Sequence, residues 1–146
     1  MCPLYTVGYE KTDISDFIDK LVANNIDTVI DVRYNPISRK KGFSKKSLEN
    51  LLNTHKINYI HMKSLGSPKT LREELYTTKD YECFFQEYRL FICKNEYDDV
   101  VKATKIAEEY QSCLLCFEMK YRECHRSELA NMICSISSKI DRVINL

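Results

Sequence analysis

The stretch DTVIDVR, residues 27–33, decides the fold of this chain. Its middle is apolar and β-branched, which is typical of a strand buried on both faces of a sheet. A second β-prone segment, LYTVG at 4–8, precedes it, and apolar residues recur at helical spacing between the two, from Asp13 or Ser15 to Asn24. These three pieces predict a β-α-β unit with a short connection, which is the repeating unit of a parallel sheet.

The same alternation continues to the end of the chain. We expect further strands at 57–62, 113–118 and 142–146, and further helices at 44–55, 71–76, 81–93, 98–110 and 127–136. Ser44 is the expected N-cap of the second helix. Because 146 residues are too few for two ordinary domains, we predict a single α/β domain over residues 1–146. Its sheet should be mostly parallel, with about five strands and helices on both faces.

The composition excludes several classes of protein. Hydrophobic residues make up 44% of the chain and charged residues 29%, which indicates a folded core rather than general disorder. No apolar run approaches the roughly 20 residues that span a bilayer, and no basic leader opens the chain. The 7 cysteines are odd in number and irregularly spaced, unlike a secreted disulfide framework. We therefore expect a cytoplasmic protein with reduced thiols and no membrane partner.

The charges are distributed unevenly along the chain. Residues 33–72 carry ten Lys or Arg and a single acid, Glu49, whereas the remainder is acidic. Such a segment can present a positive field to a phosphate-bearing ligand, including nucleic acid bound through residues 39–46. The alternative is a basic loop and helix face that is simply solvated.

Polar residues follow the predicted strands at the edge of the sheet where ligands bind in folds of this class. Asp31 and Arg33 alternate with Val32, so their side chains should share a face and interact. They form either a structural salt bridge or a pair in which Asp31 orients Arg33 toward an anion, which Arg39 would also reach. His61 ends another predicted strand and is either a structural or a functional residue.

A second group of polar residues lies in CFEMKYRECHR, 116–126. Cys116 and Glu118 are two apart on a strand and should share a face. Cys124, His125 and Arg126 fall at a helix start, where anions bind and thiol pKa values are lowered. Cys124 is thus either a reactive thiolate or a small buried residue.

Other chemistries are disfavoured by the cysteine spacing. Cys113 and Cys116 form a CxxC, but a strand points residues three apart to opposite faces, and the chain has no second CxxC. We therefore expect no metal site and no cofactor. Cys116 and Arg122 have the C-x5-R spacing of thiol phosphatases, but the intervening residues lack glycine and include Glu118, which would repel phosphate.

Together these motifs resemble one known family. The series YTVG (5–8), DVRYNPISR (31–39), YIHMKSLG (59–66), CFE (116–118) and CHR (124–126) is similar to the domain of unknown function 488 family over almost the whole chain. Two positions depart from the family pattern: Tyr9 and Asn145 stand where a histidine is often found. The resemblance strengthens the prediction of a site, and the positions that match the family are Gly8, Asp31, Arg33, Pro36, Ser38, Arg39, His61, Gly66, Cys116, Glu118, Cys124, His125 and Arg126.

Two functions fit these residues. The first is an enzyme acting on a phosphate-bearing substrate, a nucleotide or a nucleic acid, with Glu118 or His125 as general acid or base and Cys124 as nucleophile. The second is a non-catalytic module that binds nucleic acid or a nucleotide. In either case we expect the ligand to contact Asp31, Arg33, Ser38, Arg39, His61, Cys116 and Arg126.

Overall fold

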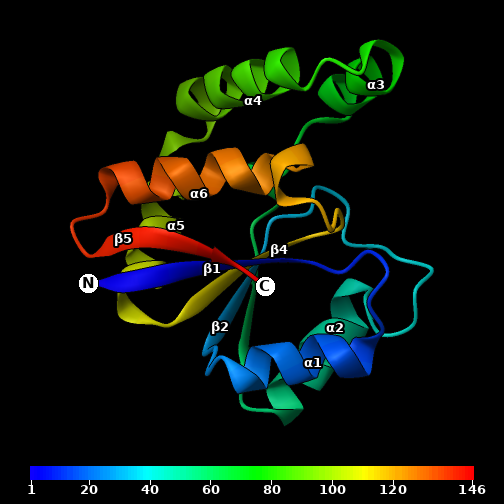
Figure 1. Ribbon diagram of the computed structural model, residues 1–146, viewed down its shortest axis with the longest axis vertical. Coiled ribbons are helices and arrows are strands. Elements are labelled where there is room, and N and C mark those ends of the chain that lie inside the picture. Colours follow the sequence, from blue (N-terminus) through cyan, green and yellow to red (C-terminus); the bar gives the residue numbers. More distant parts are fainter.

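The computed structural model describes residues 1–146 and is built around one five-stranded sheet (Figure 1). The strands are β1 (Cys2–Gly8), β2 (Thr28–Asp31), β3 (Asn58–His61), β4 (Ser112–Cys116) and β5 (Ile140–Asn145). Their spatial order is β3-β2-β4-β1-β5, and every neighbouring pair is parallel. The predicted fold class, a single α/β domain with a parallel sheet of about five strands, is confirmed.

Six α-helices connect and cover the strands. They are α1 (Ile14–Ala23), α2 (Lys45–Thr54), α3 (Lys69–Thr78), α4 (Tyr81–Asn95), α5 (Tyr97–Glu109) and α6 (His125–Ile136). Figure 1 shows α1 and α2 on one face of the sheet and α4, α5 and α6 on the other, while α3 lies beside α4. None of the helices combines the length and the apolar composition that crossing a bilayer requires.

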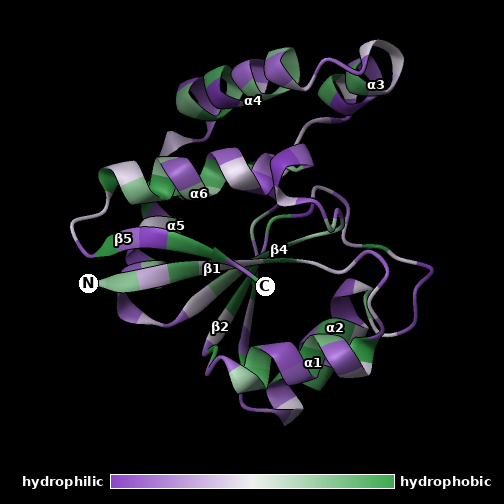
Figure 2. Ribbon diagram, in the orientation of Figure 1, coloured by the Kyte–Doolittle hydropathy of each residue, from purple (hydrophilic) through white to green (hydrophobic).

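The core forms two layers because successive side chains of a strand point to opposite faces. Val29 packs in the layer under α1 and α2, and Ile30 packs in the layer under α4, α5 and α6. In β4, Leu114 faces the second layer and Leu115 the first. The apolar colouring of β2 and β4 in Figure 2 reflects this burial on both faces.

The helix starts follow the sequence signals with one difference. Asp13 caps α1 by accepting a hydrogen bond from the backbone of Asp16 at 2.8 Å, and Cys124 is the N-cap of α6. Ser44 occupies the predicted N-cap position of α2, but its side chain makes no capping bond. Its hydroxyl instead donates to the carbonyl of Ser38 at 3.0 Å, so it closes the preceding loop on itself.

The carboxyl ends of four strands meet at one edge of the sheet. Gly8 lies opposite Cys116, and Asp31 lies opposite both His61 and Leu115. The chain leaves β1 and β2 toward α1 and α2 on one face, but it leaves the intervening β4 toward α6 on the other. Loops that diverge in this way open a crevice above the central strand, where ligands bind in open parallel sheets.

Two glycines allow the loops around this crevice to pack closely. A Cβ atom on Gly8 would overlap the carbonyl oxygen of Glu118, so the loop after β4 can cross β1 only over a glycine. A Cβ atom on Gly66 would lie 2.5 Å from the backbone nitrogen of Tyr34. At both positions only glycine fits, because another backbone segment passes too close for a Cβ atom.

Replacing Gly8 by alanine should therefore destabilise the protein. Because the added methyl group forces the loop after β4 outward, we expect the Gly8→Ala variant to lose about 1–3 kcal/mol of unfolding free energy, the usual cost of overpacking. Urea denaturation measures this loss. The control is Asn131→Ala on an exposed position of α6, which should change the free energy by less than about 0.5 kcal/mol; equal stability of the two variants would contradict the expectation.

Candidate functional site

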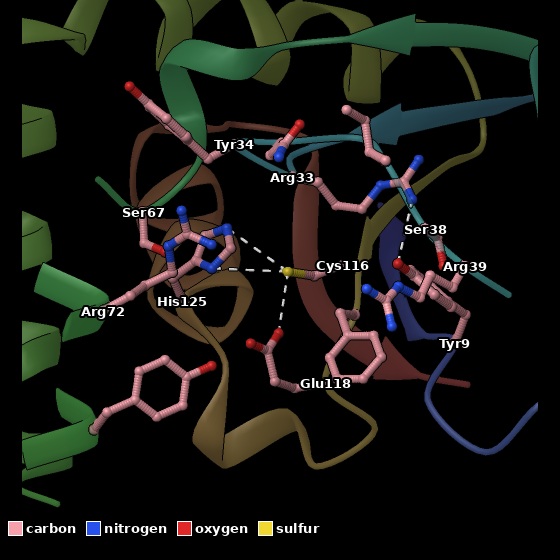
Figure 3. Close-up of a pocket in the computed structure, with 14 residues that line it drawn as sticks. Tyr9, Arg33, Tyr34, Ser38, Arg39, Ser67, Arg72, Cys116, Glu118 and His125 are labelled. Carbon is pink, nitrogen blue, oxygen red and sulfur yellow. Dashed lines mark hydrogen bonds between the residues drawn. The ribbon is translucent and has the colours of Figure 1, made fainter. Parts of the chain in front are cut away.

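A cavity of about 360 Å³ lies at the carboxyl ends of the strands, and we call it the β4 cavity (Figure 3). Its volume is in the range of small-molecule binding sites. The residues after β1, β2, β3 and β4 all contribute to its wall. It is lined by Tyr9, Arg33, Tyr34, Asn35, Ile37, Ser38, Arg39, Ser67, Arg72, Tyr76, Cys116, Phe117, Glu118 and His125.

Asp31 and Arg33 form the predicted pair, and it is buried. The Nη2 atom of Arg33 donates to Oδ2 of Asp31 at 2.7 Å, and Nε donates to Oδ1 at 2.9 Å. The Nη1 atom donates to the carbonyl of Phe43 at 2.6 Å and to the hydroxyl of Tyr9 at 3.3 Å. Each guanidinium nitrogen of Arg33 thus already has a partner within the protein, and Asp31 lies behind it, away from the cavity wall.

The environment of Asp31 also includes β3. The hydroxyl of Tyr59 donates to Oδ2 of Asp31. Burial raises the pKa of Tyr59, and the charge of Asp31 raises it further. Burial alone would lower the pKa of Arg33, but its hydrogen bonds with Asp31 and the charge of that carboxylate raise it overall. Arg33 and Tyr59 therefore both stay protonated throughout the physiological pH range.

His61 lies outside the cavity wall. Its Nε2 atom is 2.9 Å from the carbonyl oxygen of Arg33, an acceptor, so this nitrogen carries the proton and donates. His61 therefore holds the backbone after β2 in place. This contact is structural, and His61 affects the cavity only through the backbone of Arg33.

Two other arginines at the cavity have no anionic partner in the protein, although the guanidinium of Arg72 lies over the Tyr34 ring, 5.7 Å from its centroid. Arg39 and Arg72 both line it, and neither forms an ion pair or a side-chain hydrogen bond with another residue. Figure 3 shows Arg72 on the side of His125 and Arg39 on the side of Tyr9, with Cys116 between them. Ser38 also lines the cavity, and its hydroxyl accepts from the backbone of Lys40 at 3.1 Å.

Cys116, Glu118 and His125 form the floor of the cavity (Figure 3). The thiol of Cys116 donates to Oε2 of Glu118 at 3.2 Å and lies 3.8 Å from Nδ1 of His125. Burial, together with the charge of Cys124, raises the pKa of Glu118. Cys116 and Glu118 are in contact, as expected, but β4 ends at Cys116, so Glu118 lies in the loop after the strand and not on the strand face predicted from sequence.

Cys124 lies behind this floor and does not line the cavity. Burial alone would raise the pKa of its thiol, but the hydrogen bond with Cys116 and the charge of His125 lower it well below the usual value. The hydrogen bond with Cys124 and burial raise the pKa of Cys116 correspondingly. The lowered pKa favours the thiolate form of Cys124, but its sulfur does not line the cavity. This position differs from the one expected of a nucleophile.

Arg126 is also placed differently from the sequence expectation of an anion-binding residue. It is fully buried, and it donates to the carbonyl oxygens of Glu118 and Met119 and to the side chain of Asn145. These bonds fix the loop that carries the floor. Arg126 therefore positions Glu118 from behind and does not reach the cavity.

The structure thus brings together part of the predicted set. Arg33, Ser38, Arg39, Cys116, Glu118 and His125 line the cavity, whereas Asp31, His61, Cys124 and Arg126 support it from outside. The sequence analysis did not select Arg72 as a site residue, although Arg72 lies at the end of the basic segment, residues 33–72. It also missed Tyr9, which stands where the family pattern often has histidine and which stacks on Phe43 at 4.3 Å between ring centroids.

Removing one member of the buried pair should be costly. The Asp31→Ala variant leaves the Arg33 charge buried without a partner, and we expect a loss of about 3–5 kcal/mol in unfolding free energy. Because replacing both charges is far less costly, Asp31→Ala with Arg33→Met should recover roughly half of that loss or more. Chemical denaturation measures both. Glu73→Ala, which breaks the exposed pair with Lys69, is the control and should cost under about 1 kcal/mol; a similar cost for Asp31→Ala would refute the expectation.

The comparisons with known proteins place the chain in a family. The family model described as "Domain of unknown function DUF488" matches residues 13–133. Neither the search of curated proteins nor the search of solved structures finds a significant match. The matched range includes Asp31 and Arg33 as well as the whole cavity floor, and it omits only Tyr9 from the residues that line the β4 cavity. The chain therefore belongs to the DUF488 family.

Proposed function

We propose that this protein is an enzyme that acts on a phosphate-bearing substrate, a nucleotide or a nucleic acid, in the β4 cavity. One observation carries the proposal: Arg39 and Arg72 face the same cavity from opposite sides, and neither has an anionic partner in the protein. Arginine is the residue best suited to bind phosphate oxygens, because its planar guanidinium presents paired donors.

The state of Arg72 supports an external ligand. Its Nε atom is buried and has no hydrogen-bond partner. Leaving a buried donor unpaired costs about 1–3 kcal/mol, and more for a charged group. An anion bound at the guanidinium of Arg72 would offset part of that cost by compensating its charge.

Glu118 is the group we assign to proton transfer. Its carboxyl lines the cavity, and the loop that carries it is held by Arg126 and packed over Gly8. His125 is less suited, because its Nε2 already faces the carbonyl of Val32 at 3.0 Å and its Nδ1 faces two sulfurs. A carboxyl group so positioned acts as general acid or base on a substrate held by the two arginines.

The surroundings of the cavity favour a nucleotide over a bare phosphate. Tyr76 lines the wall and is 74% exposed, so its ring is available for stacking with a base. A second depression of about 650 Å³ shares Tyr34, Asn35, Arg72 and Tyr76 with the β4 cavity. It adds Lys63 and Lys69, and also Glu73, which pairs with Lys69 at 3.7 Å. Further phosphates of a polyphosphate or a nucleic-acid strand would find cations there.

Binding and turnover should respond differently to substitutions in the cavity. Because a hydrogen bond to a charged group contributes about 1.5–3 kcal/mol, Arg39→Ala and Arg72→Ala should each weaken nucleotide binding about 10-fold to 150-fold. Glu118→Gln should retain binding and lose about 100-fold or more in turnover. A panel of nucleoside phosphates and short oligonucleotides, followed by calorimetry and by product chromatography, measures both quantities.

The matched control is Arg122→Ala, because Arg122 is exposed and does not line the cavity. It should leave binding and turnover unchanged. Binding that depends on Arg39 and Arg72 with no turnover of any ligand would favour the non-catalytic nucleotide-binding or nucleic-acid-binding module. Binding that is indifferent to both arginines would refute the proposal.

If the substrate is a nucleic acid, the basic segment should contribute to affinity through its exposed lysines. Lys41, Lys45 and Lys46 are exposed, whereas Lys40 is engaged with the carbonyl of Tyr9 at 3.0 Å. Changing the three exposed lysines to alanine should reduce the slope of log affinity against log salt by about 2–3, since each phosphate contact contributes about 0.7–0.9. Fluorescence anisotropy with a labelled oligonucleotide measures the slope. The control changes three exposed lysines elsewhere, Lys102, Lys105 and Lys139; an equal effect of both triple variants would show that only net charge matters.

A further inference from the structure

The floor of the β4 cavity contains a cluster of sulfur and nitrogen atoms that the proposed function does not use. The sulfurs of Cys116 and Cys124 and a ring nitrogen of His125 all lie within 4.8 Å of one another. All three residues are buried, with 4%, 1% and 4% of their surface exposed. Cys116 is the last residue of β4, Cys124 is the N-cap of α6, and His125 is the first residue of that helix. The loop between them therefore brings the start of α6 back beside the end of β4.

We propose that Cys116, Cys124 and His125 bind a zinc ion, or a divalent metal ion of similar ligand preference, through two thiolates and the Nδ1 atom of the imidazole. Two thiolates and one imidazole form a ligand set that zinc prefers, and sets of three protein ligands are typical of catalytic zinc sites. The inference does not depend on the nature of the substrate.

The distances are close to those of a tetrahedral site. Zinc–sulfur bonds of about 2.3 Å and zinc–nitrogen bonds of about 2.0–2.1 Å place a sulfur and a nitrogen about 3.5 Å apart across the tetrahedron. Nδ1 of His125 lies 3.8 Å from Sγ of Cys116 and 3.9 Å from Sγ of Cys124. The two sulfur–nitrogen distances therefore exceed the tetrahedral value by only a few tenths of an ångström, and the two sulfurs lie within 4.8 Å of each other. Because Sγ of Cys116 is also 3.9 Å from Nε2, ligation would turn this thiol toward Nδ1.

The atoms around the cluster orient its ligands. The carbonyl oxygen of Val32 accepts from Nε2 of His125 at 3.0 Å, which keeps a proton on that nitrogen and leaves Nδ1 as the atom that would bind a metal after losing its own proton. A backbone carbonyl bound to the second ring nitrogen is the usual outer partner of a metal-binding histidine. The backbone nitrogen of Arg126 donates to the sulfur of Cys124 at 3.5 Å, and so orients the second thiol.

The fourth position of such a site faces the cavity. Cys116 and His125 line the β4 cavity, whereas Cys124 closes the cluster from behind. Glu118 has its Oε2 atom 3.2 Å from the sulfur of Cys116, yet it does not converge with all three ligands. It is therefore placed beside the open position rather than in the ligand set. A metal ion with three protein ligands binds a water molecule at its fourth position and lowers the pKa of that water.

Titration with Zn²⁺ or Co²⁺ alone tests the site in the full-length protein. We expect one ion per chain, and with Co²⁺ the charge-transfer absorption of thiolate ligands. Each of Cys116→Ser, Cys124→Ser and His125→Gln should weaken binding by more than about 100-fold, which exceeds the usual effect of changing an outer partner. Glu118→Gln should leave the affinity within a few fold. Cys113→Ser and Cys93→Ser are matched controls, since Cys113 packs under α1 and α2 and Cys93 is exposed on α4.

A second measurement covers variants that fail to fold. In the wild-type protein, one equivalent of Zn²⁺ should protect Cys116 and Cys124 from a thiol reagent and leave Cys93 reactive, as read residue by residue by mass spectrometry. The proposal is overturned if no ion binds, if binding survives loss of Cys116 and Cys124, or if these two sulfurs form a disulfide in place of a metal site. Because metal binding and thiol protection are measured without a substrate, these outcomes are independent of the phosphate-substrate proposal.

Discussion

The buried pair of Asp31 and Arg33 is the interaction on which the rest of the site depends. A carboxylate without exposed surface at the end of a central strand must be neutralised, and Arg33 does so with two hydrogen bonds. The remaining guanidinium nitrogen then binds Tyr9, which follows β1, and Phe43 in the loop before α2. Tyr59 joins the same carboxylate from β3. One ion pair thus connects three strands and one loop at the edge of the sheet where the β4 cavity forms.

The opposite side of the cavity is organised by a second buried arginine. Arg126 binds backbone carbonyls of the loop after β4, and that loop crosses β1 at Gly8, where no side chain intervenes. Both buried arginines, Arg33 and Arg126, therefore hold the loops around the cavity in place, and the arginines without an anionic partner at the cavity are Arg39 and Arg72. The two roles differ in their partners, because the guanidinium groups of Arg33 and Arg126 donate to acceptors of the protein, whereas those of Arg39 and Arg72 donate to none.

The fold was largely predictable from sequence, since strands such as DTVIDVR are apolar over their whole buried length and the helices keep a regular spacing. Which residues gather at the carboxyl ends was predictable for the same reason. The partner of each charged side chain was not predictable from sequence, because the spacing of residues places a side chain on a face but does not show which group it contacts there. Arg126 was expected to bind an anion, yet it meets the carbonyls of Glu118 and Met119. The convergence of Cys116 with Cys124 and His125 was missed because it depends on the path of the intervening loop.

The position of β4 in the sheet determines when the molecule can fold. β1 and β2 do not pair with each other, because β4 lies between them, and β5 pairs only with β1. Before residue 112 has been synthesised, a growing chain can form only the β2–β3 pair, and β1 has no partner at all. Closing the sheet requires contacts between residues more than a hundred positions apart, and such contacts slow folding. The strand that joins β1 to β2 also carries Cys116 and leads into Glu118, so the pairing that unites the two parts of the sheet also brings these residues of the cavity floor into place.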